Sequence, residues 1–128
     1  MEKIRALIVD DSSLMRTMVE RSLRLAGLDL AEVLEAGNGA EALAAVQQHK
    51  VDLILCDINM PVMNGIEFIK QLSHVENAKG VPVVMITTEG NEGHVVQALS
   101  AGARGYIRKP FTPGQVKEHV LPVLSGKL

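Results

Sequence analysis

Five short apolar runs recur along the chain, and segments with helical periodicity separate them. Most of the runs are continuous rather than alternating, and they are rich in Val, Ile and Leu. Strands that are covered on both faces have this composition, whereas a strand with one wet face alternates. The runs are residues 6–9, 30–34, 51–56, 81–86 and 105–107. The pattern predicts a parallel sheet, with the weaker second run at an edge.

The segments between the runs carry recognisable helix boundaries. Asn38, Asn64 and Thr112 each stand three residues before a Glu or Gln, which is the spacing of an N-terminal cap. Gly27 and Gly102 each follow an alanine, which is typical of a helix C-terminus. Strand and helix therefore alternate five times. With right-handed crossovers, the sequence predicts a doubly wound α/β sandwich with helices on both faces of a five-stranded sheet.

The first and last helical segments allow two further expectations. Leu14, Met18 and Leu25 recur with Met15, Ser22 and Ala26 at helical spacing and predict an apolar stripe on the first helix. Pro122 falls inside the last helical pattern, where it removes an amide donor and crowds the carbonyl of Glu118. We therefore expect the last helix to kink or to end early.

Length and charge limit the class of protein. The 128 residues suffice for one domain, and no linker or second domain is predicted. The net charge of −2 argues against nucleic-acid binding, which needs a basic excess. A single cysteine, Cys56, excludes an internal disulfide framework and lies in an apolar run, where we expect a buried thiol. No apolar stretch is long enough for a signal peptide or a membrane span, so we expect a soluble cytoplasmic protein.

Polar side chains follow four of the five runs, at the point where each predicted strand ends. They are Asp10 and Asp11, Asp57, Thr87, and Lys109. Each alone has an ordinary explanation as a cap, a turn residue or a solvated charge. The carboxyl ends of parallel strands meet at one edge of a sheet, however, and ligands bind in the crevice outside that edge. Their joint placement therefore favours a functional site.

The chemistry of such a site follows from its charges. Three carboxylates at separations of about 5 Å repel one another by roughly 3 kcal/mol per pair at an effective dielectric near 20. A hard divalent cation with oxygen ligands offsets this repulsion, and Mg²⁺ accepts a site with few protein ligands. Together with Lys109, such a cation suits phosphoryl transfer, in which a carboxylate is the nucleophile and the Thr87 hydroxyl is a donor.

The residues Asp10-Asp11, Asp57 with segment 60–65, Thr87, and segment 106–111 resemble the receiver domain of bacterial two-component response regulators. The resemblance covers essentially the whole chain. It implies a flavodoxin-like (βα)5 sandwich with strand order 2-1-3-4-5. Residues 1–128 would form a single receiver domain with no effector domain, similar to the stand-alone chemotaxis (CheY-like) type.

The resemblance also implies which residues bind the phosphoryl group and the metal. Asp57 would be the phosphoacceptor. Asp11, Asp57 and the backbone carbonyl of Asn59 would bind Mg²⁺ directly, with Asp10 acting mainly through water. Asn59 and Glu89 flank the site and would influence the lifetime of the phosphoryl group.

A second group of residues is implied to respond to phosphorylation. Lys109 would pair with the phosphoryl group, and its bond to Pro110 would be cis. Thr87 would move onto a phosphoryl oxygen after transfer, and Tyr106 would then turn inward. This movement would reshape the face made by the fourth helix, the fifth strand and the fifth helix.

The resemblance further implies a set of partners. A sensor histidine kinase would supply the phosphoryl group, and a downstream target would bind the reshaped face; a phosphatase is left open as a third partner. We expect a monomer that binds neither nucleic acid nor membrane. The protein would be no enzyme beyond catalysing its own phosphorylation and dephosphorylation. Ile58, Thr88 and Pro122 depart from the family pattern, and Pro122 affects the partner face.

Three other functions are considered. The chain could be a receiver of a phosphorelay, or one excised from a larger transcriptional or enzymatic regulator. It could be a small Mg²⁺-dependent phosphohydrolase with an Asp nucleophile, but that class needs Asp-x-Asp after the first strand. It could be a flavodoxin-like cofactor binder, but Asp10-Asp11 would repel a phosphate at the first turn.

Overall fold

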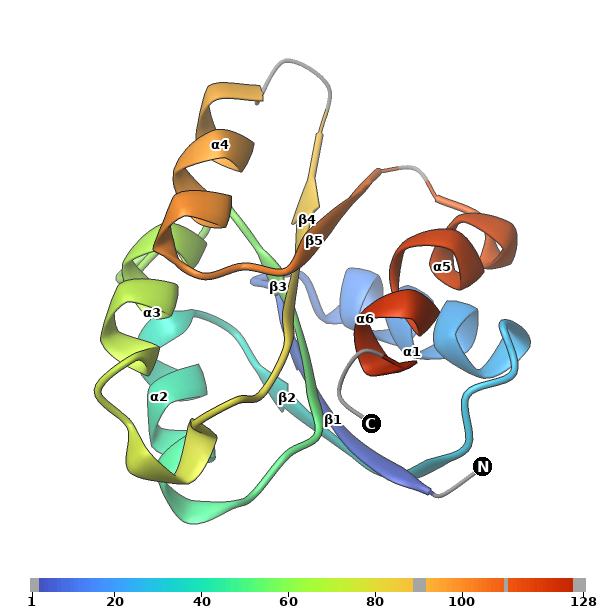
Figure 1. The fold of residues 1–128 in the computed structure, drawn as a ribbon, viewed down its shortest axis with the longest axis horizontal. Helices are drawn as coiled ribbons and strands as arrows, with labels where there is room; N and C mark the ends of the chain where they lie inside the picture. Colours follow the sequence, from blue (N-terminus) through green and yellow to red (C-terminus); the bar gives the residue numbers. More distant parts are fainter. Residues whose placement is uncertain (1–2, 89–91, 110, 126–128) are drawn as a thin grey trace.

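A computed structural model describes residues 3–88, 92–109 and 111–125 of the protein. Strands and helices alternate along the chain, with one short 3-10 turn, η1, before the fourth strand (Figure 1). The elements are β1 Ile4–Val9, α1 Ser13–Leu25, β2 Leu30–Ala36, α2 Gly39–Gln48, β3 Leu53–Asp57, α3 Gly65–Leu72, η1 Glu76–Ala78, β4 Val83–Thr87, α4 Glu92–Ala101, β5 Gly105–Arg108, α5 Pro113–His119 and α6 Leu121–Ser125.

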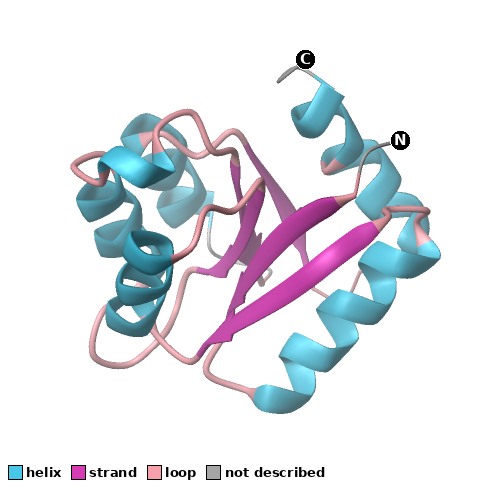
Figure 2. Cartoon of the chain, turned by 90° about the horizontal axis from the view of Figure 1, so that it is seen from below, coloured by secondary structure: helices cyan, strands magenta, loops and turns pink. Residues whose placement is uncertain are grey.

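The strands form one parallel sheet in the order β2-β1-β3-β4-β5. Helices α1, α5 and α6 cover one face, and α2, α3 and α4 cover the other (Figures 1 and 2). This arrangement confirms the predicted doubly wound sandwich, its strand order, and the edge position of β2. Among the described residues, no helix has the length and apolarity needed to cross a membrane.

The sheet is buried on both faces, which explains the continuous apolar runs. Along β3, Ile54 and Cys56 pack into the core beneath α2, α3 and α4, whereas Leu53 and Leu55 pack into the core beneath α1 and α5. Every position of such a strand has an apolar environment, so no polar residue alternates with the apolar ones. The Cys56 thiol is buried as predicted, and burial raises its pKa above the usual range.

The strand boundaries differ slightly from those predicted. β3 and β4 each begin two residues later than the apolar runs. Pro82 has no N–H to donate to a ladder, and the Asp52 carboxylate accepts a hydrogen bond from the Arg5 amide at 2.9 Å beside the start of β1. Asp57 and Thr87 are the last residues of their strands rather than the first residues after them.

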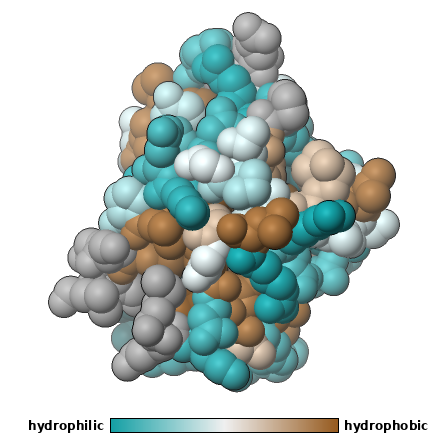
Figure 3. Space-filling view, turned by 90° about the vertical axis from the view of Figure 1, so that its right-hand side faces the viewer, coloured by the Kyte–Doolittle hydropathy of each residue, from teal (hydrophilic) through white to brown (hydrophobic). Residues whose placement is uncertain are grey.

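The predicted apolar stripe of α1 is only partly its buried face: Ala26 is buried and Met15 packs against the core. Leu14, Met18 and Leu25 are 70%, 50% and 61% exposed, whereas Val19 and Leu23 are fully buried. The buried set has the same helical spacing but is displaced by one residue, about 100° around the axis. The exposed and the buried apolar residues of α1 both recur at helical spacing, so spacing alone could not show which of them face the core. Figure 3 views the molecule from the side of α1, α5 and α6, where hydrophobic patches lie among hydrophilic ones.

The predicted helix boundaries are confirmed. The side chains of Asn38, Asn64 and Thr112 cap α2, α3 and α5, and the last two caps are complete capping boxes. The last helical segment is broken at Val120 into α5 and α6, as the position of Pro122 predicted.

A glycine lets α3 begin against the end of β3. The Gly65 amide donates to the Ile58 carbonyl at 2.9 Å. A Cβ at Gly65 would overlap the carbonyl oxygen of Asp57 and would lie 2.8 Å from Met85 Cε. The approach of α3 to the strand that carries Asp57 therefore requires a residue without a side chain.

We expect Gly65→Ala to lower the free energy of unfolding by about 1–3 kcal/mol, because the added methyl group forces backbone apart. Urea denaturation measures this change. The matched control is Gly93→Ala in α4, where no atom would lie within 4 Å of the new Cβ. That substitution should stabilise the protein by up to about 1 kcal/mol. Equal effects of the two substitutions would contradict the close-approach argument.

Candidate functional site

Three carboxylates meet at the carboxyl edge of the sheet. Asp10 and Asp11 follow β1, and Asp57 ends the neighbouring strand β3. The register pairs Val9 with Cys56, so Asp10 and Asp57 lie side by side. Carboxylate oxygens of the three residues lie within 4.8 Å of one another. Asp10 is 1% exposed and Asp57 8% exposed, whereas Asp11 is open to solvent.

Lys109 reaches these carboxylates from the far edge of the sheet. Its Nζ lies 3.2 Å from Asp10 Oδ2 and 3.4 Å from Asp57 Oδ2. Because β4 separates β5 from β3, the long side chain must extend across the end of β4. The Lys109 amide donates to the Thr87 carbonyl at 2.7 Å, which fixes the base of the side chain against that strand.

The ammonium does not fully compensate the carboxylates. Burial is the main cause that raises the pKa of Asp57; Lys109 opposes it, and Asp10 adds to it. Burial lowers the pKa of Lys109, but Asp57 and Asp10 together outweigh this and raise it above its usual value. Asp10 and Asp57 thus share one ammonium, with the Asp11 carboxylate nearby, and the ionised form of Asp57 is disfavoured.

The turn after β1 is held by its own network. Asp10 Oδ1 accepts from the Ser12 amide at 2.9 Å, and the Ser12 hydroxyl caps α1. The Arg16 guanidinium donates to the Asp10 carbonyl at 2.6 Å and to Glu35 Oε1 on β2 at 2.8 Å. The sequence analysis missed Arg16. The available signal was a basic residue one turn into the helix that follows Asp10.

The other predicted site residues lie at the same edge. Thr87 is buried at the end of β4, and its hydroxyl donates to the Thr88 carbonyl at 3.2 Å. Asn59 is exposed, and its backbone N–H donates a long hydrogen bond of 3.4 Å to Asp57 Oδ1. These positions bring Thr87 and Asn59 to the carboxylates from adjacent strands.

Tyr106 lies on the edge strand β5 and is 39% exposed. Its ring is stacked on that of His119, with 6.4 Å between the ring centroids. Two predicted residues, Glu89 and Pro110, lie outside the described residues.

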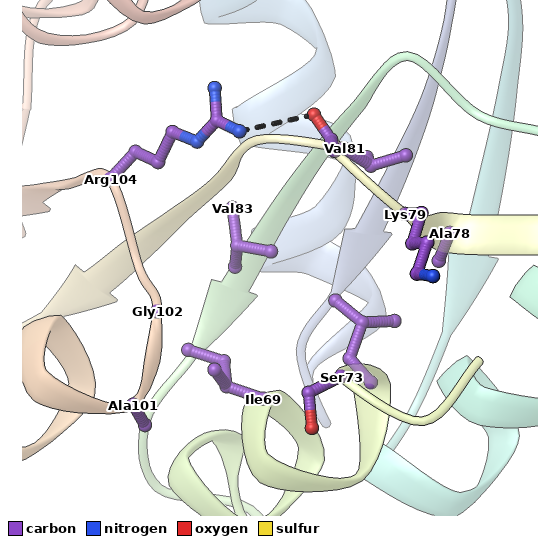
Figure 4. Close-up of a pocket in the computed structure, with 11 residues that line it drawn as sticks. Ile69, Ser73, Ala78, Lys79, Val81, Val83, Ala101, Gly102 and Arg104 are labelled. Carbon is purple, nitrogen blue, oxygen red and sulfur yellow. Dashed lines mark hydrogen bonds between the residues drawn. The ribbon is translucent and has the colours of Figure 1, made fainter. Parts of the chain in front are cut away.

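A hollow of about 370 Å³ opens beside the site. It is lined by Met15, Met18, Ser22, Thr88, Lys109 and Phe111. A smaller pocket of about 200 Å³ lies between α3, the segment before β4 and the end of α4, where Arg104 donates to the Gly80 carbonyl (Figure 4). Val83 at the start of β4 lines this second pocket, and four residues along a strand span about 13 Å. The second pocket is therefore separate from the carboxylates at the other end.

Comparison with known proteins identifies the family. Residues 6–121 match the family described as response regulator receiver domain. The chain is a response regulator receiver domain. It is 41% identical over 123 residues to a chemotaxis protein CheY homolog of Campylobacter jejuni, covering 95% of this chain and 93% of that protein.

Solved receiver structures agree with this assignment. The chain is 38% identical to the chemotaxis protein CheY4 of Vibrio cholerae, with a TM-score of 0.81 over 99% of this chain and all of that one. It is 26% identical to the receiver domain of a Pseudomonas aeruginosa sensor histidine kinase, with a TM-score of 0.78 over 91% of this chain and 93% of that one. That structure has a magnesium ion coordinated in the active site cleft.

These findings make the protein a signalling receiver of the chemotaxis type. They do not favour the alternatives weighed from the sequence. The Asp57-Ile58-Asn59 segment lies at the end of β3, whereas a phosphohydrolase with an Asp nucleophile needs Asp-x-Asp after its first strand. The first turn of this receiver presents Asp10 and Asp11, which would repel the phosphate of a flavin cofactor.

One residue of the loop after β3 is held in a costly conformation. Val62 has φ of +68° and is 82% exposed. This left-handed region is disfavoured for a β-branched side chain, because its Cβ crowds the backbone. An exposed side chain gains little from burial to offset that cost.

We expect Val62→Asn to stabilise the receiver by about 1 kcal/mol, since asparagine tolerates the left-handed region. Urea denaturation gives the change. Val62→Ala is the control: it also removes the exposed side chain but keeps a Cβ without a polar group, so its gain should be smaller. A destabilised Val62→Asn variant would contradict the account.

Asp57→Asn should raise the thermal midpoint of the metal-free protein at neutral pH, because the raised pKa of Asp57 makes its ionised form unfavourable. A raised folded-state pKa gives stability that is present at low pH and lost as pH rises through it. The difference between variant and wild type should therefore shrink as pH falls toward the ordinary aspartate value.

Thermal melts from neutral to acidic pH in EDTA measure this difference. The exposed residue Asp29 supplies the control, because Asp29→Asn lies outside the carboxylate group. If Asp57→Asn lowered the midpoint at neutral pH, the charge argument would be wrong.

Proposed function

We propose that Asp57 accepts a phosphoryl group from a histidine kinase, and that the receiver then changes its α4–β5–α5 face to bind a downstream target. The observation that carries the proposal is the position of Asp57, a nearly buried carboxylate held against the Lys109 ammonium beside the open Asp11. This environment supplies a nucleophile, a cation for the transferred oxygens and access from solvent.

A divalent cation fits the donor set. Oxygen atoms of Asp10, Asp11 and Asp57 lie within one ion's reach of each other, and their charge exceeds that of Lys109. Mg²⁺ prefers such hard oxygen ligands and keeps several waters. We propose that Asp11, Asp57 and the carbonyl of Asn59 hold it directly, and that Asp10 acts through water. Bound Mg²⁺ would reduce the repulsion between a carboxylate nucleophile and an anionic donor. The magnesium-bound Pseudomonas aeruginosa receiver supports this proposal by similarity.

The transfer itself needs little from the protein beyond position and charge. An oxygen of the Asp57 carboxylate forms a bond to phosphorus, the phosphorus–nitrogen bond of the donor phosphohistidine breaks, and the imidazole leaves with that electron pair. An acyl phosphate on Asp57 results. Lys109, already 3.4 Å from Asp57 Oδ2, would then pair with a phosphoryl oxygen. Asn59 at the open side of the site would influence how fast water removes the group, and we assign the same role to Glu89.

The response would begin at Thr87. Its hydroxyl, which donates to the Thr88 carbonyl in this state, would turn to a phosphoryl oxygen. Thr87 is paired in register with Arg108, so its movement acts directly on β5. Tyr106 would then turn inward. Val96 and Leu99 on α4 are exposed hydrophobic residues and would contact the target.

Because the similar proteins of Campylobacter jejuni and Vibrio cholerae are named chemotaxis proteins, we propose that the downstream target belongs to a chemotaxis system. We further propose that the receiver acts in the cytoplasm as a monomer, and that it catalyses only its own phosphorylation and dephosphorylation.

Intact-mass spectrometry after incubation with acetyl phosphate and Mg²⁺ tests the phosphoacceptor and the metal together. We expect one added phosphoryl group on the wild type, and none on Asp57→Asn or in EDTA. Mg²⁺ should also raise the thermal midpoint of the wild type by binding the folded form. If no adduct forms and beryllofluoride, a phosphoryl analogue, does not bind either, the proposed function is wrong.

A further inference from the structure

The Cβ of Tyr106 and its ring lie on different sides of the sheet. Its register partner Met85 packs into the core beneath α2, α3 and α4, whereas its neighbour Ile107 packs beneath α1 and α5. Side chains alternate along a strand, so the Tyr106 Cβ must point to the α4 side. Arg108, two residues on, confirms this direction, since it lies 3.7 Å from Glu92 of α4.

The Tyr106 ring nevertheless contacts the opposite layer. It is stacked on His119 of α5, with an interplanar angle of 24°. Because β5 is an edge strand, a side chain on it can turn outward across the edge of the sheet. The stack thus holds the ring at the edge of the sheet on the α5 side, and Tyr106 is 39% exposed there.

The break in the last helical segment sets the position of His119. Pro122 cannot donate to the carbonyl four residues before it, and α5 ends at His119. The end of α5 lies directly against β5: a Cβ on Gly105 would be 3.6 Å from the His119 carbonyl and 3.6 Å from Val123 of α6. His119 therefore occupies the last turn of α5, next to the strand that carries Tyr106.

We propose that His119 is a positioning residue that keeps the Tyr106 ring in its outward orientation and thereby sets how readily the receiver adopts its activated state. The proposal rests on the proposed function, in which Tyr106 turns inward after phosphorylation. Inward rotation must break the ring stack. A stacked aromatic pair shifts such an equilibrium by about twofold to tenfold, and a ligand that favours the inward state must overcome that bias.

The composition provides a selective probe. Tyr106 is the only tyrosine of the chain, so a tyrosine-specific isotope label gives one set of ring signals. In the free wild type, nuclear Overhauser contacts should join the Tyr106 and His119 rings. Beryllofluoride with Mg²⁺ should abolish these contacts. If the free protein shows no contact between the rings, the proposal is overturned.

Beryllofluoride titration in Mg²⁺ at one fixed pH measures the energetic effect. We expect His119→Ala to bind beryllofluoride about twofold to tenfold more tightly than the wild type, because the outward state has lost its stack. His119→Phe keeps a stacking ring and should restore wild-type affinity. Lys117→Ala, an exposed substitution in the same helix, is the matched control and should change nothing.

A double-mutant cycle assigns the effect to the ring pair. In a Tyr106→Leu background, His119→Ala should no longer change the affinity. Unchanged affinity of the single His119→Ala variant, in a protein whose wild type binds beryllofluoride, would overturn the role of His119 alone. A wild type that binds no beryllofluoride would instead overturn the proposed function on which this role rests.

Discussion

The shared ammonium of Lys109 is the interaction on which the site depends. It lies between two nearly buried carboxylates, Asp10 and Asp57, that come from adjacent strands, while the lysine itself comes from the far edge of the sheet. Only a parallel sheet brings these three chain segments to one edge, and only the observed strand order leaves β4 between Lys109 and Asp57. Burial, to which the neighbouring Asp10 adds, outweighs the effect of the single ammonium, so the pKa of Asp57 stays raised. A bound cation would offset the carboxylate charge that Lys109 leaves uncompensated, which agrees with the Mg²⁺ proposed for this site.

The positions of Asp10 and Asp57 around that ammonium are fixed by contacts to their main-chain carbonyls and not by their carboxylates. Gly65 allows α3 to begin against the carbonyl of Asp57, and Arg16 binds the carbonyl of Asp10 while pairing with β2. These contacts leave the carboxylate oxygens of both residues available to Lys109. The carboxylates repel one another, so groups that carry no negative charge must hold them close together. The neutral glycine and the cationic Arg16 fulfil this requirement from two different helices.

The features that could be predicted from the sequence are those for which a physical rule allows only one structure. Continuous apolar runs can be buried only between two helical layers, and residues that follow parallel strands must converge, so the sheet and the carboxylates were predictable. Pro122 broke the last helix for the reason expected, the missing amide donor. The buried face of α1 was not predictable, because two sets of residues, displaced by one position, fit the same period. The turn after Asp57 could be recognised from its residues. The left-handed backbone of Val62 could not, because it is set by how the loop joins β3 to α3 and not by the residue types in the loop. The contact between Tyr106 and His119 could not be predicted either, since strand alternation assigns the tyrosine to the other layer.

The chemical site and the partner face are joined through the last two strands. The Lys109 amide donates a hydrogen bond to the Thr87 carbonyl, and Thr87 is in register with Arg108. The ends of β4 and β5 therefore hold Tyr106 and the two residues proposed to bind the phosphoryl group as one unit. A phosphoryl group can shift this unit only by the difference between its contacts in the two states. In the proposed switch, the hydrogen bond from the Thr87 hydroxyl to the Thr88 carbonyl and the stack of Tyr106 on His119 would both be lost, so both contacts oppose the shift. The first lies at the catalytic edge, where the chemistry constrains every atom. The second lies on the surface at the end of a broken helix, where a residue can change without altering Asp57. The balance between resting and activated states can therefore be adjusted at His119 independently of the phosphoryl chemistry.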